Sequence, residues 1–393
     1  MSTLKVDGIR SNSASSDAIT LASDGTCTAN ITNRTNKNLV VNGACLIAQR
    51  GTAATQSEDC ATVDRFAFNK SGTNETPTQA QVDVASGTTP YTLGFRKAFQ
   101  ITNGNQTGGA GTSDFIRMRY AFEAQDIANS GWNYTSSSSF ITLSFWVKSS
   151  VAQSFHVNMR AKDGSDNNYT FETGSLSANT WTKITKTISG NSNLTFDNNT
   201  DEGLYIHFHM FRGTGNTGTV SQDQWVSYDS ALLTQDQTST WYTTNDATFE
   251  LTGVQLEVSD HATDFEHRSY ADELLRCKRY YVEMGRSTSG ETGYVLNGLQ
   301  AYATTALFGV LAQLPVTMRA KPTCTTVGSI KFSNAAGSNV YAPSSTLTAN
   351  QTSTNYIGTS GTAFSSSLFT QGGFAVTYVT PDGTNYIKVD AEL

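Results

Sequence analysis

Apolar and polar residues alternate in several stretches in the middle of the chain, and this period of two predicts β-strands. In residues 140–148 the alternation places Ile141, Leu143, Phe145 and Val147 on one face. Three further stretches show the same pattern: residues 115–123, 155–160 and 204–211. Their inward positions are Ile116, Met118, Tyr120, Phe122, Phe155, Val157, Met159, Leu204, Ile206, Phe208 and Met210. Because no amphipathic helix separates these stretches, we expect two antiparallel sheets packed as a jelly-roll β-sandwich.

One segment has a different pattern. Residues 269–281 begin with the capping residue Ser269, carry acids early and bases late, and place apolar residues at helical spacing. We expect a helix there that links the sandwich to a second β domain. The strands of that domain are predicted in residues 306–314 and 329–332 and in a closing hairpin. The hairpin joins residues 374–379 to 386–389 through the turn Pro381-Asp382-Gly383.

The predicted fold class is all-β: a jelly-roll β-sandwich plus a C-terminal β domain, joined by a short helix and preceded by an extended N-terminal arm. The expected boundaries are 1–36 for the arm, 37–268 for the sandwich, 269–281 for the helix and 282–393 for the C-terminal domain. The arm has short strand patterns at 18–21 and 28–32 but no core of its own. Such strands need a neighbour, either another copy of the chain or a docking partner. The alternative is a frayed terminus.

Composition narrows the function. The 393 residues include 26 Lys and Arg against 33 Asp and Glu, a net charge of -7, so we do not expect a nucleic-acid partner. The N-terminus lacks a signal-like apolar run, and no stretch is apolar for long enough to span a bilayer, so membrane insertion is not expected. The five cysteines are widely spaced and form no CxxC pair, which predicts free thiols, no zinc site and no cofactor.

The outward positions of the predicted strands carry an unusual set of side chains. They combine rings, imidazoles, amides and guanidinium groups rather than the Ser, Thr, Lys and Glu of a solvated face. The proposed site residues are Trp146, His156, Asn158, Arg160, Tyr205, His207 and His209, with Arg117, Arg119, Thr142, Ser144 and Phe211 as further outward positions. Flat rings and directional donors suit a sugar, so one interpretation is a glycan groove. The other is a contact with a sister subunit, where Tyr, Trp and Arg are also enriched.

Other candidate chemistry is weaker. The His-x-His pair His207 and His209 could meet one metal, but with no third ligand nearby in sequence a structural role is favoured. No nucleophile elbow, zinc-protease motif or phosphate-binding glycine loop occurs, so we expect no enzymatic activity. The nearest carboxylate pairs are Asp201-Glu202 and Asp264 with Glu266; these loop acids are expected to be solvated.

Several runs resemble virion structural and tail-fibre proteins of tailed bacteriophages, particularly marine ones. The sandwich opens with Asn38-Leu39-Val40-Val41-Asn42-Gly43, Ala48-Gln49-Arg50-Gly51 and Asp64-Arg65-Phe66. It closes with residues 251–258, then Asp264-Phe265-Glu266-His267-Arg268-Ser269-Tyr270 and Cys277-Lys278-Arg279-Tyr280-Tyr281; residues 314–322 match a further segment. The sandwich also resembles carbohydrate-binding modules of jelly-roll type, through loose motifs such as Thr180-Trp181-Thr182-Lys183.

This resemblance implies a homotrimeric virion protein, assembled in the host cytoplasm and carried on the tail. Its expected partners are itself, other tail proteins through the N-terminal arm, and a glycan on the host-cell surface. Trimeric display lets weak single contacts sum to firm attachment. Two alternatives remain open: a glycan depolymerase tailspike, and a purely architectural component such as a capsid decoration or fibre adaptor without a ligand.

Overall fold

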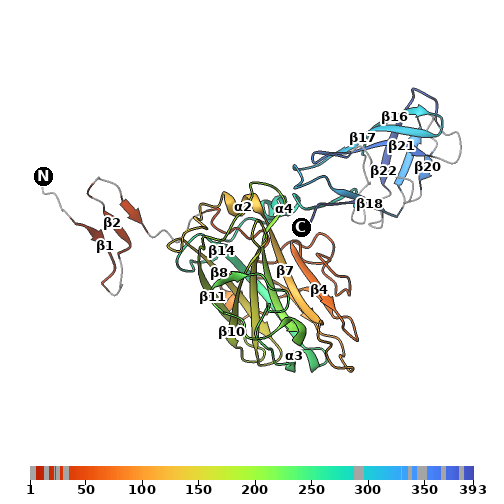
Figure 1. The fold of residues 1–393 in the computed structure, drawn as a ribbon. Helices are drawn as coiled ribbons and strands as arrows, with labels where there is room; N and C mark the ends of the chain where they lie inside the picture. The colour runs from red at the N-terminus through yellow and green to blue at the C-terminus, as the bar shows by residue number, and fades with distance from the viewer. Residues whose placement is uncertain are drawn as a thin grey trace.

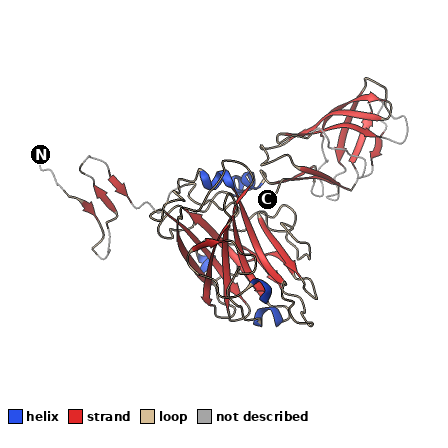
Figure 2. Ribbon diagram, viewed as in Figure 1, coloured by secondary structure: helices blue, strands red, loops and turns tan. Residues whose placement is uncertain are grey.

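The computed structural model describes residues 6–12, 17–21, 23, 27–29, 35–286, 296–328, 330–334, 339–342, 352–363, 369–379 and 385–393. Strands dominate this part of the chain, and its four α-helices are all short (Figure 2). A two-sheet sandwich lies in the centre of Figure 1, with the N-terminal strands set apart from it on one side and the C-terminal sheets on the other. The protein is all-β, as the sequence predicts.

The sandwich consists of two antiparallel sheets. The six-stranded sheet has the order β13 (Trp225–Ser227), β10 (Asn167–Ser175), β9 (Ser154–Ala161), β12 (Glu202–Arg212), β7 (Phe115–Glu123) and β4 (Phe66–Ser71). The five-stranded sheet has the order β11 (Thr182–Ser189), β8 (Phe140–Ser149), β14 (Thr248–Glu257), β6 (Lys97–Thr102) and β5 (Thr78–Asp83). Helices α1 (Thr89–Thr92), α2 (Ala124–Ala128) and α3 (Thr240–Thr243) and the 3-10 turn η1 (Thr214–Asn216) lie in the connections.

The core between the sheets contains the inward positions that the alternation predicts. Ile141, Leu143, Phe145 and Val147 are all 0% exposed, and every inward residue predicted on β7, β9 and β12 is buried as well. Aromatic rings join the two sheets: Phe145 meets Phe208 edge to face with centroids 5.1 Å apart. Burying such side chains stabilises the fold by about 1.5–3 kcal/mol each.

One predicted alternation breaks down at the end of β12. A β-bulge between His209 and Phe211 shifts the register against β7. Phe211, predicted outward, therefore joins the core and stacks on Tyr242 with centroids 4.0 Å apart. The next residue, Arg212, then belongs to the outer face of the sheet. A bulge inserts one residue and reverses the parity of the residues after it, which a strict period of two cannot anticipate.

The predicted linking helix is present as α4 (Tyr270–Cys277), with Ser269 as its N-cap. The Ser269 side chain accepts a hydrogen bond from the Asp272 backbone N–H at 3.2 Å. The helix ends at Cys277 rather than at Tyr281, because Tyr281 already begins the next strand.

The C-terminal strands form two sheets. One has the order β15 (Tyr281–Met284), β23 (Tyr386–Asp390) and β18 (Thr323–Val327). The other has the order β20 (Asn339–Ala342), β19 (Ile330–Asn334), β22 (Phe374–Val379), β16 (Leu296–Ala303), β17 (Ala306–Gln313) and β21 (Tyr356–Ala363). The predicted closing hairpin is wrong, because β22 and β23 lie in different sheets. Strand pattern identifies each strand but not its partner; the predicted turn 381–383 lies outside the described residues.

The N-terminal strands β1 (Gly8–Ile9), β2 (Ile19–Leu21) and β3 (Cys27–Ala29) form a small sheet in the order β1-β2-β3. They match the strands predicted at 18–21 and, in part, at 28–32, of which residues 30–32 lie outside the described residues. Ile9 is 53% exposed and Leu21 39% exposed. Among the residues that the structure describes, no helix is long and apolar enough to span a bilayer.

Candidate binding site

Six of the seven predicted site residues lie together on the outer face of the six-stranded sheet. We call this surface the polar face; it comprises Arg117, Arg119, His156, Asn158, Arg160, Asn168, Thr170, Tyr205, His207, His209 and Arg212. The strand register arranges these side chains in rows. His207 lies between Arg119 and Asn158, and Tyr205 lies next to Arg160. In the next row His209 lies between Arg117 and His156. Neighbours in a row are within side-chain contact.

Trp146 does not belong to this face. It lies on β8, which is in the five-stranded sheet, where its register partners are Lys183 and Thr252. Its ring packs in a separate small cluster that includes Phe95 and Trp181. The prediction that Trp146 shares a surface with the histidines is therefore wrong. Outward-facing residues of two strands form one surface only when both strands belong to the same sheet. The alternation along one strand does not show which other strands it pairs with.

The polar face is largely covered by the protein itself. Asn158 and His209 are 1% exposed and His207 is 6% exposed. The connection that follows η1 crosses the β9–β10 half of the face. In it the Leu233 carbonyl accepts a hydrogen bond from Thr170 Oγ1 at 3.0 Å, and the Tyr228 ring lies 3.6 Å from the Arg160 guanidinium carbon. The β4–β7 half is less covered, and Arg117 and Arg119 remain partly exposed.

The electrostatics of the polar face keep its histidines neutral. Burial, reinforced by the charges of the surrounding arginines, lowers the pKa of His207 and of His209 well below 6.5. His207 Nδ1 lies 3.2 Å from Asn158 Oδ1. Neither ring nitrogen of His209 has a hydrogen-bond partner among the residues that the structure describes. His156 Nε2 lies 3.4 Å from a Glu172 carboxylate oxygen without forming a hydrogen bond.

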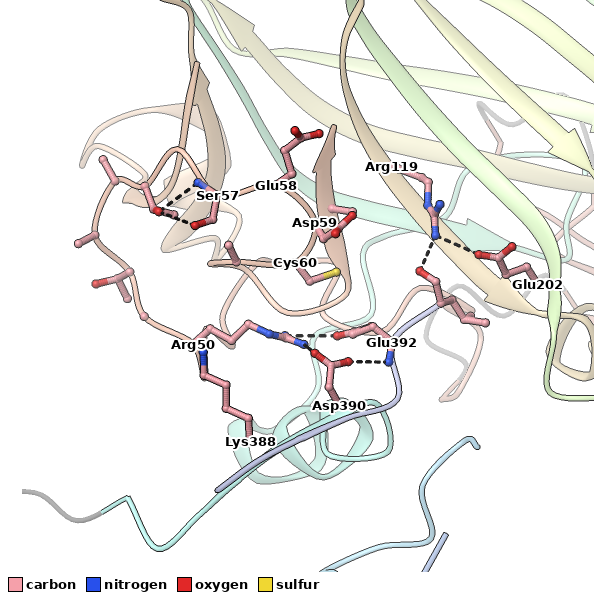
Figure 3. Close-up of a pocket in the computed structure, with 18 residues that line it drawn as sticks. Arg50, Ser57, Glu58, Asp59, Cys60, Arg119, Glu202, Lys388, Asp390 and Glu392 are labelled. Carbon is pink, nitrogen blue, oxygen red and sulfur yellow. Dashed lines mark hydrogen bonds and ion pairs between the residues drawn. The ribbon is translucent and has the colours of Figure 1, made fainter. Parts of the chain in front are cut away.

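A cleft of about 900 Å³ opens at the β4–β7 edge of the polar face (Figure 3). Its lining comprises Arg50, Gly51, Thr52, Ala53, Ala54, Thr55, Ser57, Glu58, Asp59, Cys60, Ala61, Ala67, Arg119, Glu202, Lys388, Asp390, Glu392 and Leu393. We call it the junction cleft, because it lies where the sandwich meets the last C-terminal residues. Arg119 belongs to both the cleft and the polar face. It lies 3.1 Å from Glu202 and also donates to the Leu393 carbonyl.

The junction cleft is polar and charge-paired. Arg50 lies 3.2 Å from Asp390 and 3.4 Å from Glu392, and its guanidinium stacks on the Tyr281 ring at 3.5 Å. A neighbouring cleft of about 470 Å³ shares Glu202 with it and is also lined by Asp163. Sequence patterns could not reveal the junction cleft, because its walls come from segments more than 300 residues apart.

The carboxylates expected to be solvated divide into two kinds. Asp201 and Asp264 are exposed as predicted, whereas Glu202 and Glu266 are partly buried in ion pairs. Burial alone would raise the pKa of Glu202, but hydrogen bonds from Tyr205 and Lys162 and the charge of Arg119 hold it below its usual value. Within the described residues no three His, Cys, Asp or Glu side chains are grouped to hold a metal ion.

Two of the runs that carry the tail-fibre resemblance, residues 64–66 and 277–281, meet in the structure in a buried polar network. Glu123, 0% exposed, accepts two hydrogen bonds of 2.7 Å from Arg279 and one of 2.7 Å from the Tyr280 hydroxyl. Arg65 stacks on the Tyr280 ring at 3.5 Å and donates to the Ala121 carbonyl at 2.6 Å. These contacts hold the sandwich to the segment between α4 and β15, so Arg65, Arg279 and Tyr280 have structural roles here.

No protein-family model matches the chain, and no curated protein matches it. Among solved structures, part of the chain is similar to the enzymatically active domain of tailspike protein 4 of bacteriophage CBA120, at 11% identity and a TM-score of 0.32, over 58% of this chain and 24% of that chain. The chain thus spans about a quarter of that tailspike domain.

Two smaller structures are covered almost completely. A family 11 carbohydrate-binding module of a Clostridium thermocellum cellulase aligns at 12% identity and a TM-score of 0.26, over 56% of this chain and 99% of that chain. A putative sugar-binding protein of Bacteroides thetaiotaomicron aligns at 11% identity and a TM-score of 0.28, over 57% of this chain and 100% of that chain. At these identities and TM-scores the similarities assign no family.

Proposed function

We propose that this protein is a bacteriophage tail-fibre or tail-appendage component that attaches, without catalysis, to a glycan on the host-cell surface. The observation that carries the proposal is the polar face together with the junction cleft at its edge. The Nε atoms of Arg117 and Arg212 lack hydrogen-bond partners in the described part of the chain, and Arg117 is partly exposed. Buried polar atoms are normally hydrogen-bonded, so these unpaired donors lack acceptors. The hydroxyl oxygens of a glycan can supply those acceptors.

The size and chemistry of the junction cleft suit a short stretch of polysaccharide. A volume of about 900 Å³ falls in the range of small-molecule sites. Its lining offers guanidinium, carboxylate and hydroxyl groups, which match the donors and acceptors of a sugar. The Tyr205 ring lies beside it, 5.0 Å from the Arg119 guanidinium carbon.

The N-terminal arm supports assembly into a homotrimer docked on other tail proteins. Among the described residues of the arm, Val6, Ile9 and Leu21 remain exposed. Three short strands gain stability only by packing against another surface. Light scattering should give three chains per particle for the full-length protein and fewer after removal of residues 1–36; a full-length protein that is monomeric both with and without these residues contradicts this assembly.

The adhesion proposal is tested by binding of the purified protein to arrayed bacterial surface polysaccharides. We expect binding without release of reducing ends, and at least a tenfold loss of affinity for Arg119→Gln, which removes a cation shared by cleft and polar face. Lys183→Gln, an exposed cation on the other sheet, is the matched control. Retained binding in Arg119→Gln places the glycan elsewhere, and absence of binding to every glycan favours a purely architectural role.

One observation favours a depolymerase as the second candidate. In the smaller cleft, burial and the nearby charges of Asp197 and Asp201 raise the pKa of Asp163, as a general acid of a glycosidase requires. Release of reducing ends by the wild type, abolished in Asp163→Asn, would establish that activity in place of simple adhesion.

A further inference from the structure

Two arginines lie side by side at one end of the polar face. Arg117 on β7 is the register partner of His209 on β12, and Arg212, turned outward by the bulge, is the partner of Phe115. The two guanidinium carbons lie 4.9 and 5.3 Å from the centre of the same Phe115 ring. Arg212 is 5% exposed, while Arg117 and Phe115 remain partly exposed, so the pair is recessed but reaches solvent.

Neither guanidinium has an ion-pair partner among the described carboxylates. The other two arginines of the polar face do, since Arg160 pairs with Asp166 and Arg119 with Glu202. The Nε atoms of Arg117 and Arg212 are buried and have no hydrogen-bond partner within the described parts of the chain. Burial lowers the pKa of both to about 10, aided at Arg117 by the charge of Arg212, so both remain cations at neutral pH.

The other groups around the pair do not neutralise it. The row through Arg117 runs from Asn69 through His209 and His156 to Glu172. The carboxylates at its two ends have other partners: Asp59 accepts a hydrogen bond of 3.1 Å from Asn69, and Glu172 accepts hydrogen bonds of 3.1 Å from Ser154 and 2.7 Å from Gln222.

Two adjacent recessed cations without a counter-ion repel each other and attract an anion strongly, because screening by solvent is reduced there. The forked donors of a guanidinium match the oxygens of a carboxylate or a sulfate. We propose that Arg117 and Arg212 together bind the oxyanion group of an acidic glycan, a uronate carboxylate or a sulfate ester. This inference rests on the proposed glycan-binding function and adds that the glycan is a polyanion.

The experiment compares three polymers with one backbone: dextran, carboxymethyl-dextran and dextran sulfate. Their binding to the full-length protein is measured by calorimetry at low and at physiological salt. We expect the two acidic polymers to bind and neutral dextran not to bind. The acidic polymer that binds more tightly shows whether the site prefers a carboxylate or a sulfate. Arg117→Gln and Arg212→Gln should each weaken acidic binding at least tenfold, while Lys183→Gln should leave it within twofold.

Thermal melting separates loss of the site from loss of the fold. Both Arg→Gln variants should melt at or above the wild-type temperature, because each removes one of two repelling charges. Acidic binding that is absent in the wild type, or unchanged in both variants, overturns the inference. A wild type that binds only neutral glycans on the array, with that binding lost in Arg119→Gln, overturns it while leaving the proposed function intact.

Discussion

The two outer faces of the sandwich differ in whether their charged side chains have partners. On the five-stranded sheet, Lys148 lies 2.8 Å from Glu250 and 5.2 Å from the centre of the Trp181 ring, and Lys183 is open to water. On the six-stranded sheet, Arg117 and Arg212 are recessed without a carboxylate partner in the described chain. A charge that is paired or exposed to water either stabilises the fold or leaves its stability unchanged. A recessed charge without a partner lowers the stability of the fold. This difference indicates that the arrangement of charges on the polar face serves a purpose other than the stability of the fold.

The largest expected contrast between the faces comes from removing one aromatic ring from each. Tyr205 is 4% exposed, stacks on His207 with centroids 5.6 Å apart, and donates its hydroxyl to Glu202. Tyr205→Ala should lower the free energy of unfolding by about 3–4 kcal/mol. Trp146→Ala should lower the free energy of unfolding by only about 2 kcal/mol, because Trp146 is half-buried and part of its surface is already in water. Urea unfolding measures both, and a larger loss for Trp146→Ala would contradict the tight packing of the polar face.

The polar face should also make the protein sensitive to mild acid. His207 and His209 stay neutral in the fold because burial lowers their pKa, whereas in the unfolded chain they take up protons as the pH falls through about 6.5. The unfolded state then binds more protons, so stability present above pH 6.5 is lost as the pH falls from there to 5. Each histidine contributes a slope of about 1.4 kcal/mol per pH unit.

His209→Gln should remove one such slope. Burial raises the pKa of Asp64 and of Asp126 to about 6, which produces the opposite slope, so the measured quantity is the difference between variant and wild type. Parallel stability curves for wild type and His209→Gln between pH 7 and 5 would show that this imidazole is not held neutral.

Local pattern was sufficient for the fold class but not for the site. Alternation identified β7, β8, β9 and β12 and the faces of most of their residues, because the period of two is a property of each strand alone. It could not place Trp146 on the correct sheet, nor β23 beside β15, because pairing is decided by contacts between distant segments. Arg212 was missed for a local reason, the bulge after His209, which the sequence does not mark with a glycine or proline.

A smaller effect is expected from relieving the repulsion on the polar face. Arg212→Gln should raise the free energy of unfolding by about 1 kcal/mol, because the side chain keeps hydrogen-bonding groups and loses a recessed charge. Arg117→Gln should act in the same direction. The gain should shrink only slightly with added salt, since the pair is recessed. Calorimetry at two salt concentrations measures it, and a clear loss of stability in both variants would show that the chain itself supplies an anion to the pair.

The smallest effect is expected at the paired cation on the opposite face. Lys148 is 23% exposed at its side chain and lies beside a largely buried Glu250, which also accepts a hydrogen bond of 3.1 Å from Gln100. Lys148→Gln should lower the free energy of unfolding by about 0.5–1 kcal/mol, the value of a partly exposed pair, because the amide can still donate to the carboxylate. The sign is opposite to that of Arg212→Gln, although both changes remove one positive charge from a sheet face. Since a general effect of net charge would move both variants in the same direction, equal shifts in the two melting curves would mean that total charge, and not the local pairing of each cation, distinguishes the two faces.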